Sequence, residues 1–256
     1  MKREMKTQAC IFDLDGTLVD TLADLGAAVN HALLGRGYLP LDLEHYRHFV
    51  GHGIRRLCAR SLAASRVLEA PEKAAWQGGK APAPQVWRAL PAPYAEAEDE
   101  EAVEGILADF YAYYQEHCLD ASAPYAGVCE GLRRLAGRGL ILGILSNKEE
   151  RLCRHIVSEL FPDIPFRKVA GMREDCPAKP NPSRLLAWLK DWGLEPGSCW
   201  LVGDSAVDAQ TAQRAGLRQA LVTWGFSAEE DLAPLAQAQE LYRSPEELFK
   251  ALEADC

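Results

Sequence analysis

The chain has 256 residues, of which 48% are hydrophobic and 25% charged, and its formal net charge is −9. This composition excludes a wholly disordered chain and suits one large globular domain, or a core domain with a smaller second one. The negative charge repels a nucleic-acid backbone, and no apolar run reaches the ~18 residues that a membrane span needs. We therefore expect no nucleic-acid partner, no membrane partner and a cytoplasmic location. The eight cysteines are scattered without metal-site spacing, which predicts reduced thiols.

The first half of the chain is predicted to form one strand followed by helices. The strand covers the buried run 8–12. Helices are predicted over residues 21–34, over 41–65 with a break at 51–53, and over about 97–118. Between them, residues 66–100 are rich in Ala and Pro. Because the prolines forbid one continuous helix, this stretch predicts a loop or short helical pieces.

After Pro124 the pattern changes to alternating helices and strands. Helices are predicted over 128–136, 149–160, 183–192 and 207–215, and strands over 140–145, 167–170, 198–202 and 219–222. Strands separated by helices of this length predict a parallel sheet, and their continuous apolar runs indicate burial on both faces. The first strand then belongs to this sheet. The sequence predicts an α/β core domain of residues 1–20 and 125–256 with a helical domain of residues 21–124 inserted into it.

Polar residues follow three predicted strands at their carboxyl ends, which is where a parallel sheet presents its chemistry. Asp13 follows the first strand, and Gly203 with Asp204 follows the strand over 198–202. Ser146 and Asn147 follow the strand over 140–145. Because these ends meet at one edge of the sheet, we expect a site there.

Asp13 and Asp15 stand two residues apart in the segment FDLDGT. Two such close carboxylates raise each other's proton affinity unless a cation stabilises them, so the pair predicts a bound Mg²⁺ or separate roles. We expect Asp13 to attack phosphorus as a nucleophile and Asp15 to move protons. Gly16 and Thr17 allow a sharp turn whose amides face the phosphoryl oxygens. An Asx-turn that caps the strand is the structural alternative.

The segment FDLDGTLVD resembles the first motif of the haloacid dehalogenase superfamily, and three further motifs follow in order. Ser146 in LGILSNK resembles the second, whose hydroxyl holds the phosphoryl group. Lys179 in AKPNPS resembles the third, whose ammonium neutralises charge on the nucleophile and the phosphoryl oxygens. GDSAVD resembles the fourth, in which Asp204 would ligate Mg²⁺ while Asp208 and Ser205 would support the site.

This resemblance implies a Rossmann-like core with an α-helical cap inserted after the first motif. It also implies that Asp15 ligates Mg²⁺ through its main-chain carbonyl, next to Asp13 and Asp204. The segments LVDTLADLGAAVN, FVGHGIRRLCARSL and AGLRQALVTWGF resemble phosphoglycolate phosphatase-like members in particular.

In that group a Gly-x-Gly loop of the cap and a nearby Arg help to close over the substrate. Six residues are thereby expected to bind substrate: Thr17 and Asn147 in the core, and Gly51, His52, Gly53 and Arg56 in the cap. His52 stands where such phosphatases commonly carry Asn, and Asn181 stands where His is common. A plain helix boundary at 51–53 with solvated arginines is the structural alternative.

Together these observations predict a Mg²⁺-dependent phosphatase for a small-molecule phosphate ester such as phosphoglycolate, acting as a monomer or homodimer. Asp15 argues against a dehalogenase, which lacks it, and Leu25 stands where sugar-phosphate mutases carry His. The lysines Lys73 and Lys80 lie in the irregular stretch, which argues against a phosphonate hydrolase. Pyrophosphate, nucleotides and sugar phosphates stay open as substrates. A different class also stays open, namely a weakly catalytic phosphate-sensing or partner-binding protein.

Overall fold

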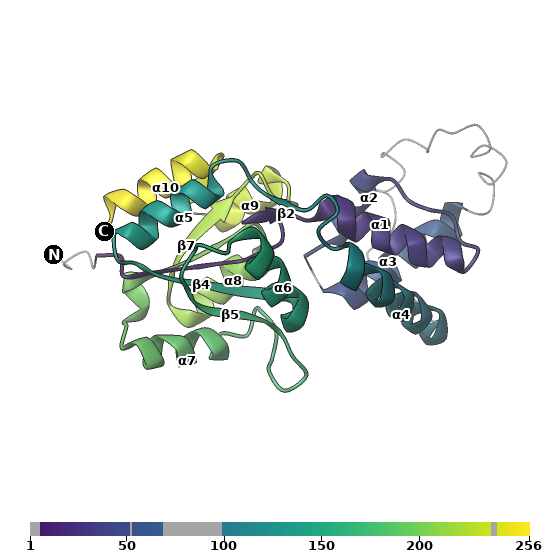
Figure 1. Ribbon diagram of the computed structural model, residues 1–256, viewed down its shortest axis with the longest axis horizontal. Helices are drawn as coiled ribbons and strands as arrows, with labels where there is room; N and C mark the ends of the chain where they lie inside the picture. Colours follow the sequence, from purple (N-terminus) through teal and green to yellow (C-terminus); the bar gives the residue numbers. More distant parts are fainter. Residues whose placement is uncertain (1–5, 52, 69–98, 237–239) are drawn as a thin grey trace. The chain divides into compact units, whose positions relative to one another are not determined.

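The computed structural model describes residues 6–51, 53–68, 99–236 and 240–256. The chain divides into two compact units, one of residues 1–20 with 123–256 and the other of residues 21–122 (Figure 1). Most of the predicted irregular stretch, residues 69–98, lies outside the described residues. None of the helices in the described ranges has the length and apolar character to cross a membrane.

The first unit is built on a six-stranded sheet in the order β5-β4-β1-β6-β7-β8. Its strands are β1 (Ala9–Phe12), β4 (Ile141–Glu149), β5 (Phe166–Met172), β6 (Cys199–Gly203), β7 (Arg218–Val222) and β8 (Leu241–Tyr242). All neighbouring pairs run parallel. In the centre of the sheet, Ala9 lies opposite Ile141 on one side and Cys199 on the other. The predicted α/β fold class with a parallel sheet is thus confirmed.

Helices cover both faces of this sheet, as its apolar strands require. They are α5 (Val128–Gly137), α6 (Glu150–Leu160), α7 (Ser183–Trp192), α8 (Ala206–Ala215), α9 (Glu229–Leu232) and α10 (Pro245–Ala254). Ile11 of β1 packs in one buried cluster with Leu185 of α7. The next residue, Phe12, points to the other face, where its ring lies 6.2 Å from that of Phe249 in α10. Figure 1 shows α5 and α10 together on the face opposite α7.

Strand β4 is longer than predicted and changes the setting of two predicted site residues. It was expected to end at Leu145, but it continues to Glu149, which pairs with Met172 of β5 after a register shift. The prediction that Ser146 and Asn147 follow the strand is therefore wrong, since both lie within it. The physical reason is that β5 continues alongside and offers main-chain partners beyond the apolar run, which the sequence pattern does not reveal.

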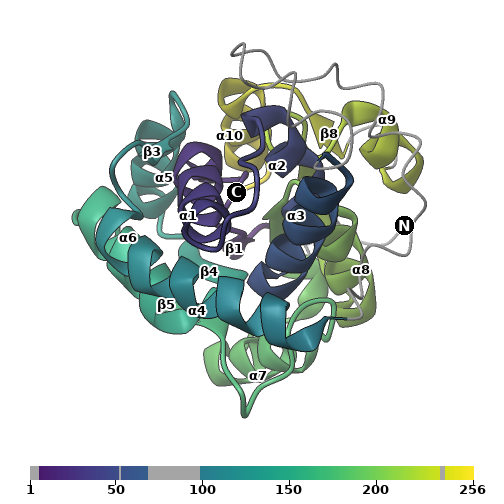
Figure 2. The ribbon, with the colours of Figure 1, turned by 90° about the vertical axis from the view of Figure 1, so that its right-hand side faces the viewer.

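The second unit contains four α-helices within its described residues (Figure 2). They are α1 (Leu22–Gly35), α2 (Leu43–Phe49), α3 (Ile54–Leu68) and α4 (Glu100–His117). Their shared core includes the fully buried Tyr46 and Phe110. The buried Asp24 of α1 accepts hydrogen bonds from the backbone of Ala121 and from the backbone and hydroxyl of Ser122. This carboxylate thus holds together the two ends of the unit.

The chain leaves and re-enters the first unit at one place. A short strand β2 (Val19–Asp20) pairs antiparallel with β3 (Ala123–Pro124), so Val19 lies opposite Pro124. Neither strand was predicted, because two residues carry no periodic pattern. The pairing keeps the start and the end of the inserted segment next to each other.

Candidate active site

Asp13 lies at the carboxyl end of the central strand, at the start of a tight loop. Its amide continues the ladder by donating to the Val202 carbonyl at 2.8 Å, and its Oδ1 accepts from the Leu14 amide at 2.7 Å. The loop turns at Gly16, which has a φ of 79°. A Cβ atom there would overlap the carboxylate of Asp204, so the loop requires glycine both for its backbone angle and for this close approach.

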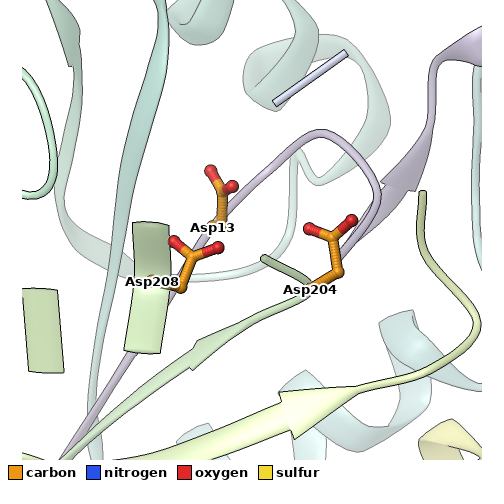
Figure 3. Close-up of side chains that lie close together, drawn as sticks. All are labelled: Asp13, Asp204 and Asp208. Carbon is orange, nitrogen blue, oxygen red and sulfur yellow. The ribbon is translucent and has the colours of Figure 1, made fainter. Parts of the chain in front are cut away.

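Three carboxylates come together at this edge of the sheet (Figure 3). Asp13, Asp204 and Asp208 each offer an oxygen within 4.8 Å of the others. Asp204 directly follows β6, and it accepts hydrogen bonds from the Thr17 hydroxyl at 3.0 Å and the Phe226 amide at 2.8 Å. Thr17, expected to bind substrate, is thus a hydrogen-bond partner of a predicted metal ligand.

The helix α8 supplies the third carboxylate from its first turn. Ser205 is the N-cap residue of this helix, and its hydroxyl accepts from the Asp208 amide at 3.4 Å. The same hydroxyl donates to Asp208 Oδ2 at 2.5 Å. Ser205 therefore fixes both the main chain and the side chain of Asp208, which is buried.

Lys179 joins two of these carboxylates through its buried ammonium. Its Nζ lies 3.0 Å from Asp13 Oδ1 and 2.6 Å from Asp208 Oδ1, and its side chain is only 2% exposed. Asn147 holds the main chain of Lys179 in place, because its amide group donates to the Lys179 carbonyl at 3.0 Å and accepts from the Lys179 N–H at 2.8 Å. Asn147, which was expected to bind substrate, thus positions Lys179 in the structure.

The crowding of charge shifts the pKa values of this group. Burial raises the pKa of Asp204 to about 8, with further increases from Asp13 and Asp208. Burial also raises the pKa of Asp13 to about 6, against the opposing effect of Lys179. For Lys179 burial lowers the pKa, but the neighbouring carboxylates of Asp13 and Asp208 outweigh it and the net shift is upward.

The donor set fits a hard divalent cation such as Mg²⁺. The cluster offers carboxylate oxygens, which Mg²⁺ prefers, and the raised pKa values of Asp13 and Asp204 reflect repulsion and burial that a cation would offset. The carboxylate of Asp15 is not part of this cluster. Its Oδ1 lies 3.0 Å from Lys148 Nζ, so a metal contact from Asp15 would come from its main chain, as the resemblance implies.

Lys148 is a residue that the sequence reasoning missed. It contacts both oxygens of Asp15, at 3.0 and 3.1 Å, and its own amide donates to the Ser146 hydroxyl at 3.2 Å. The available signal was spacing, since Ser146 and Lys148 stand two residues apart and residues so spaced share one face of a strand. This spacing did not point to Lys148, because the strand was expected to end before Ser146.

The remaining predicted substrate residues belong to the helical unit. Gly51 and Gly53 lie just before α3, with φ angles of 101° and 88° that favour glycine. Arg56 is exposed in the first turn of that helix. His52 lies outside the described residues. A substrate-binding role for these four residues stays a prediction.

Known proteins resemble this chain in sequence and in fold. The sequence model of one family, described as haloacid dehalogenase-like hydrolase, matches residues 7–216. The phosphoglycolate phosphatase of Rhodospirillum rubrum is 32% identical over 87% of this chain and 82% of its own length. The N-acetylmuramic acid 6-phosphate phosphatase of Pseudomonas aeruginosa is 29% identical over 100% of both chains. A crystal structure of a candidate phosphoglycolate phosphatase from Lactobacillus delbrueckii has a TM-score of 0.79 and 28% identity, covering 97% of this chain and 99% of its own.

Fold and site together define an α/β enzyme whose acidic residues and buried lysine gather at the carboxyl edge of a parallel sheet. The chain belongs to the haloacid dehalogenase-like hydrolases. The predicted family and the predicted enzyme class, a phosphatase, are both confirmed.

Proposed function

We propose that this phosphatase hydrolyses a small phosphate monoester through an aspartyl phosphate on Asp13, with Mg²⁺ as its cofactor. The observation that carries the proposal is the position of Lys179, whose buried ammonium contacts Asp13 and Asp208 beside the third carboxylate, Asp204. A nucleophilic carboxylate needs nearby positive charge to approach an anionic phosphoryl group, and this arrangement supplies it.

In the first step an oxygen of Asp13 attacks phosphorus, and the bond from phosphorus to the ester oxygen breaks. The proton of the Asp15 carboxyl group goes to that oxygen, so the alcohol leaves neutral. Lys179 offsets the charge on the nucleophile, and the Ser146 hydroxyl is proposed to hold a phosphoryl oxygen. Mg²⁺, held by Asp13, Asp204 and the Asp15 carbonyl, would supply Lewis-acid stabilisation of the phosphoryl oxygens when bound.

In the second step a water molecule attacks the phosphorus of the aspartyl phosphate, and the bond to the Asp13 oxygen breaks. The water's proton goes to the Asp15 carboxylate, which returns Asp15 to its acid form. One ester and one water thus yield one alcohol and one phosphate, and the enzyme is unchanged. Asp15 lies 15% exposed, so its carboxylate has some access to solvent.

Phosphoglycolate is the first candidate substrate, because the phosphoglycolate phosphatases of Rhodospirillum rubrum and Pseudomonas aeruginosa are 32% and 34% identical to this chain. A second candidate is N-acetylmuramic acid 6-phosphate. The phosphatase named for it matches 100% of this chain, whereas the phosphoglycolate phosphatases match 87% and 85% of it. Both compounds carry a carboxylate as well as a phosphate, and Arg56 is the proposed partner for it.

The test is a comparison of kcat/KM for phosphate release with Mg²⁺, across these two esters, other sugar phosphates, pyrophosphate and nucleotides. A preference of about a hundredfold, roughly 2.7 kcal/mol in transition-state binding, would identify the substrate. A flat profile would refute both named substrates and leave a general phosphatase. Wild-type turnover no faster than that of Asp13→Asn would refute catalysis and favour the phosphate-sensing or partner-binding alternative. Cytoplasmic location and a monomeric or dimeric state stay predictions.

A further inference from the structure

Lys148 carries a buried positive charge close to the proposed catalytic residues. Its side chain is 1% exposed, on the last part of β4. A buried ammonium is costly unless charged or polar groups pair with it. The residue is therefore not a solubilising surface lysine, and its position must be supported by what it contacts.

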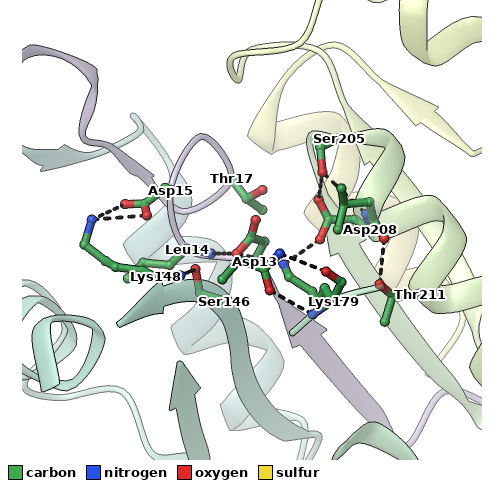
Figure 4. Close-up of polar contacts among 12 residues, drawn as sticks. Asp13, Leu14, Asp15, Thr17, Ser146, Lys148, Lys179, Ser205, Asp208 and Thr211 are labelled. Carbon is green, nitrogen blue, oxygen red and sulfur yellow. Dashed lines mark hydrogen bonds and ion pairs between the residues drawn. The ribbon is translucent and has the colours of Figure 1, made fainter. Parts of the chain in front are cut away.

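The contact is with the carboxylate of Asp15, and it involves both oxygens. Lys148 Nζ lies 3.0 Å from Oδ1 and 3.1 Å from Oδ2. Contact with both oxygens restrains where the carboxylate lies and how its plane is turned, which contact with one oxygen would not do. In Figure 4 this pair is drawn on one side of Asp13, and Lys179 is drawn on the other.

Two lysines thus contact three of the four acidic side chains at this edge of the sheet. Lys179 contacts Asp13 and Asp208, whereas Lys148 contacts Asp15. The main chain of Lys148 is itself fixed, because its amide donates to the Ser146 hydroxyl and strand β4 continues to Glu149. The proton-transfer carboxylate is accordingly held by a rigid strand of the sheet and not by its own loop alone.

We propose that Lys148 is a positioning residue, which holds the Asp15 carboxylate in the orientation from which it exchanges protons with the ester oxygen and the attacking water. This proposal rests on the proposed function above. In that mechanism Lys148 contacts neither the substrate nor the metal, and its effect on the reaction comes through Asp15.

The test uses Lys148→Met, which keeps most of the length of the side chain and removes its charge. We expect kcat for phosphoglycolate to fall about a hundredfold with KM changed less than about threefold, in line with the loss of a positioned acid–base group. With p-nitrophenyl phosphate, whose leaving group needs no proton, the first nitrophenolate should still appear as a rapid burst. The slow step should then be hydrolysis of the aspartyl phosphate, so phosphorylated enzyme accumulates.

A double-variant cycle separates this role from structural damage. If Lys148 acts through Asp15, then Asp15→Asn with Lys148→Met should be no slower than Asp15→Asn alone. The double variant also removes both charges together, so it tests the proposal even where Lys148→Met folds poorly. Lys148→Arg should recover part of kcat. Lys168→Met is the matched control. Lys168 lies on β5, and its Nζ lies 2.5 Å from Oδ2 of Asp191, which has no part in the proposed chemistry.

Full activity of Lys148→Met, or additive losses in the double variant, would overturn the proposal while the proposed function stands. That function is checked in the same series by wild-type turnover and by its loss in Asp13→Asn. Absence of wild-type turnover would overturn both.

Discussion

Asp13 is the side chain on which the proposed chemistry depends most directly. Asp13→Asn keeps the shape of the residue but removes the nucleophilic oxygen, so we expect phosphate release to fall by about a thousandfold or more. No phosphorylated protein should form with labelled substrate. Asp163→Asn serves as the control, because that aspartate lies on the surface and pairs with Arg133. Turnover by Asp13→Asn near that of the control would disprove the nucleophile assignment.

Asn147 offers a second test at the residue scale. Asn147→Ala removes both hydrogen bonds to the main chain of Lys179, which is a buried residue. An unpaired buried polar group costs about 1–3 kcal/mol, and the displaced lysine should lower kcat by about tenfold to a hundredfold. Asn181→Ala, in the same loop but exposed, should stay within about twofold of wild type. Steady-state kinetics of the two variants checks this, and equal kcat values would contradict it.

The sequence allowed the positions of Asp13, Asp204 and Lys179 to be predicted, because two of them directly follow strands and all three stand in recognisable motifs. It did not reveal the partner of Asp15. Lys148 is 133 residues away along the chain, and its contact depends on four strand residues beyond the apolar run. Pairs of this kind are set by the register between strands, which no local pattern encodes.

At the scale of the elements, α5 and α10 pack through Gly131. A Cβ atom at Gly131 would overlap the ring of Phe249, whereas one at Gly137, in the same helix, would meet nothing within 4 Å. Gly131→Ala should therefore lower the free energy of unfolding by about 1–3 kcal/mol. Gly137→Ala should raise it by up to about 1 kcal/mol, since alanine favours a helix. Urea unfolding of both variants measures this. Equal stabilities would show that α10 moves aside without cost.

Elements with clear end signals were predicted closely. The helix over 183–192 has the predicted bounds, and Gly193 caps its end with a φ of 67°. The start of α8 was predicted one residue late, at 207 and not Ala206, because its N-cap Ser205 was assigned only to the site. The short pair β2 and β3 could not be predicted, since each depends wholly on the other. Local signals therefore define helix ends well and short paired strands poorly.

For the whole molecule, the acidic cluster links stability to pH and Mg²⁺. Burial raises the pKa of Asp204 to about 8, above the value of about 4 in an unfolded chain. Between about pH 4 and pH 8, Asp204 holds a proton in the folded state that it has lost in the unfolded chain. The contribution of Asp204 therefore lowers the stability of the metal-free protein as the pH rises. Mg²⁺ must displace that proton, so it should raise Tm more at about pH 8 than at about pH 5.

Thermal melts at both pH values, with and without Mg²⁺ at matched ionic strength, measure this difference. Asp204→Asn should abolish most of the Mg²⁺ response, because it replaces a proposed ligand and removes the titrating group. An equal rise in Tm at both pH values would contradict the linkage between metal binding and the protonation of Asp204.

The central strand β1 precedes both of its neighbours in the chain by more than a hundred residues. Its neighbours β4 and β6 begin at Ile141 and Cys199, so the ribosome must make most of the chain before Phe12 has strands on both sides. The segment 21–122 emerges continuously in between, and its own helices can pack as they appear. Until β6 emerges, β1 can pair on one side only, so an apolar strand at the centre of the future sheet has an open edge for most of synthesis.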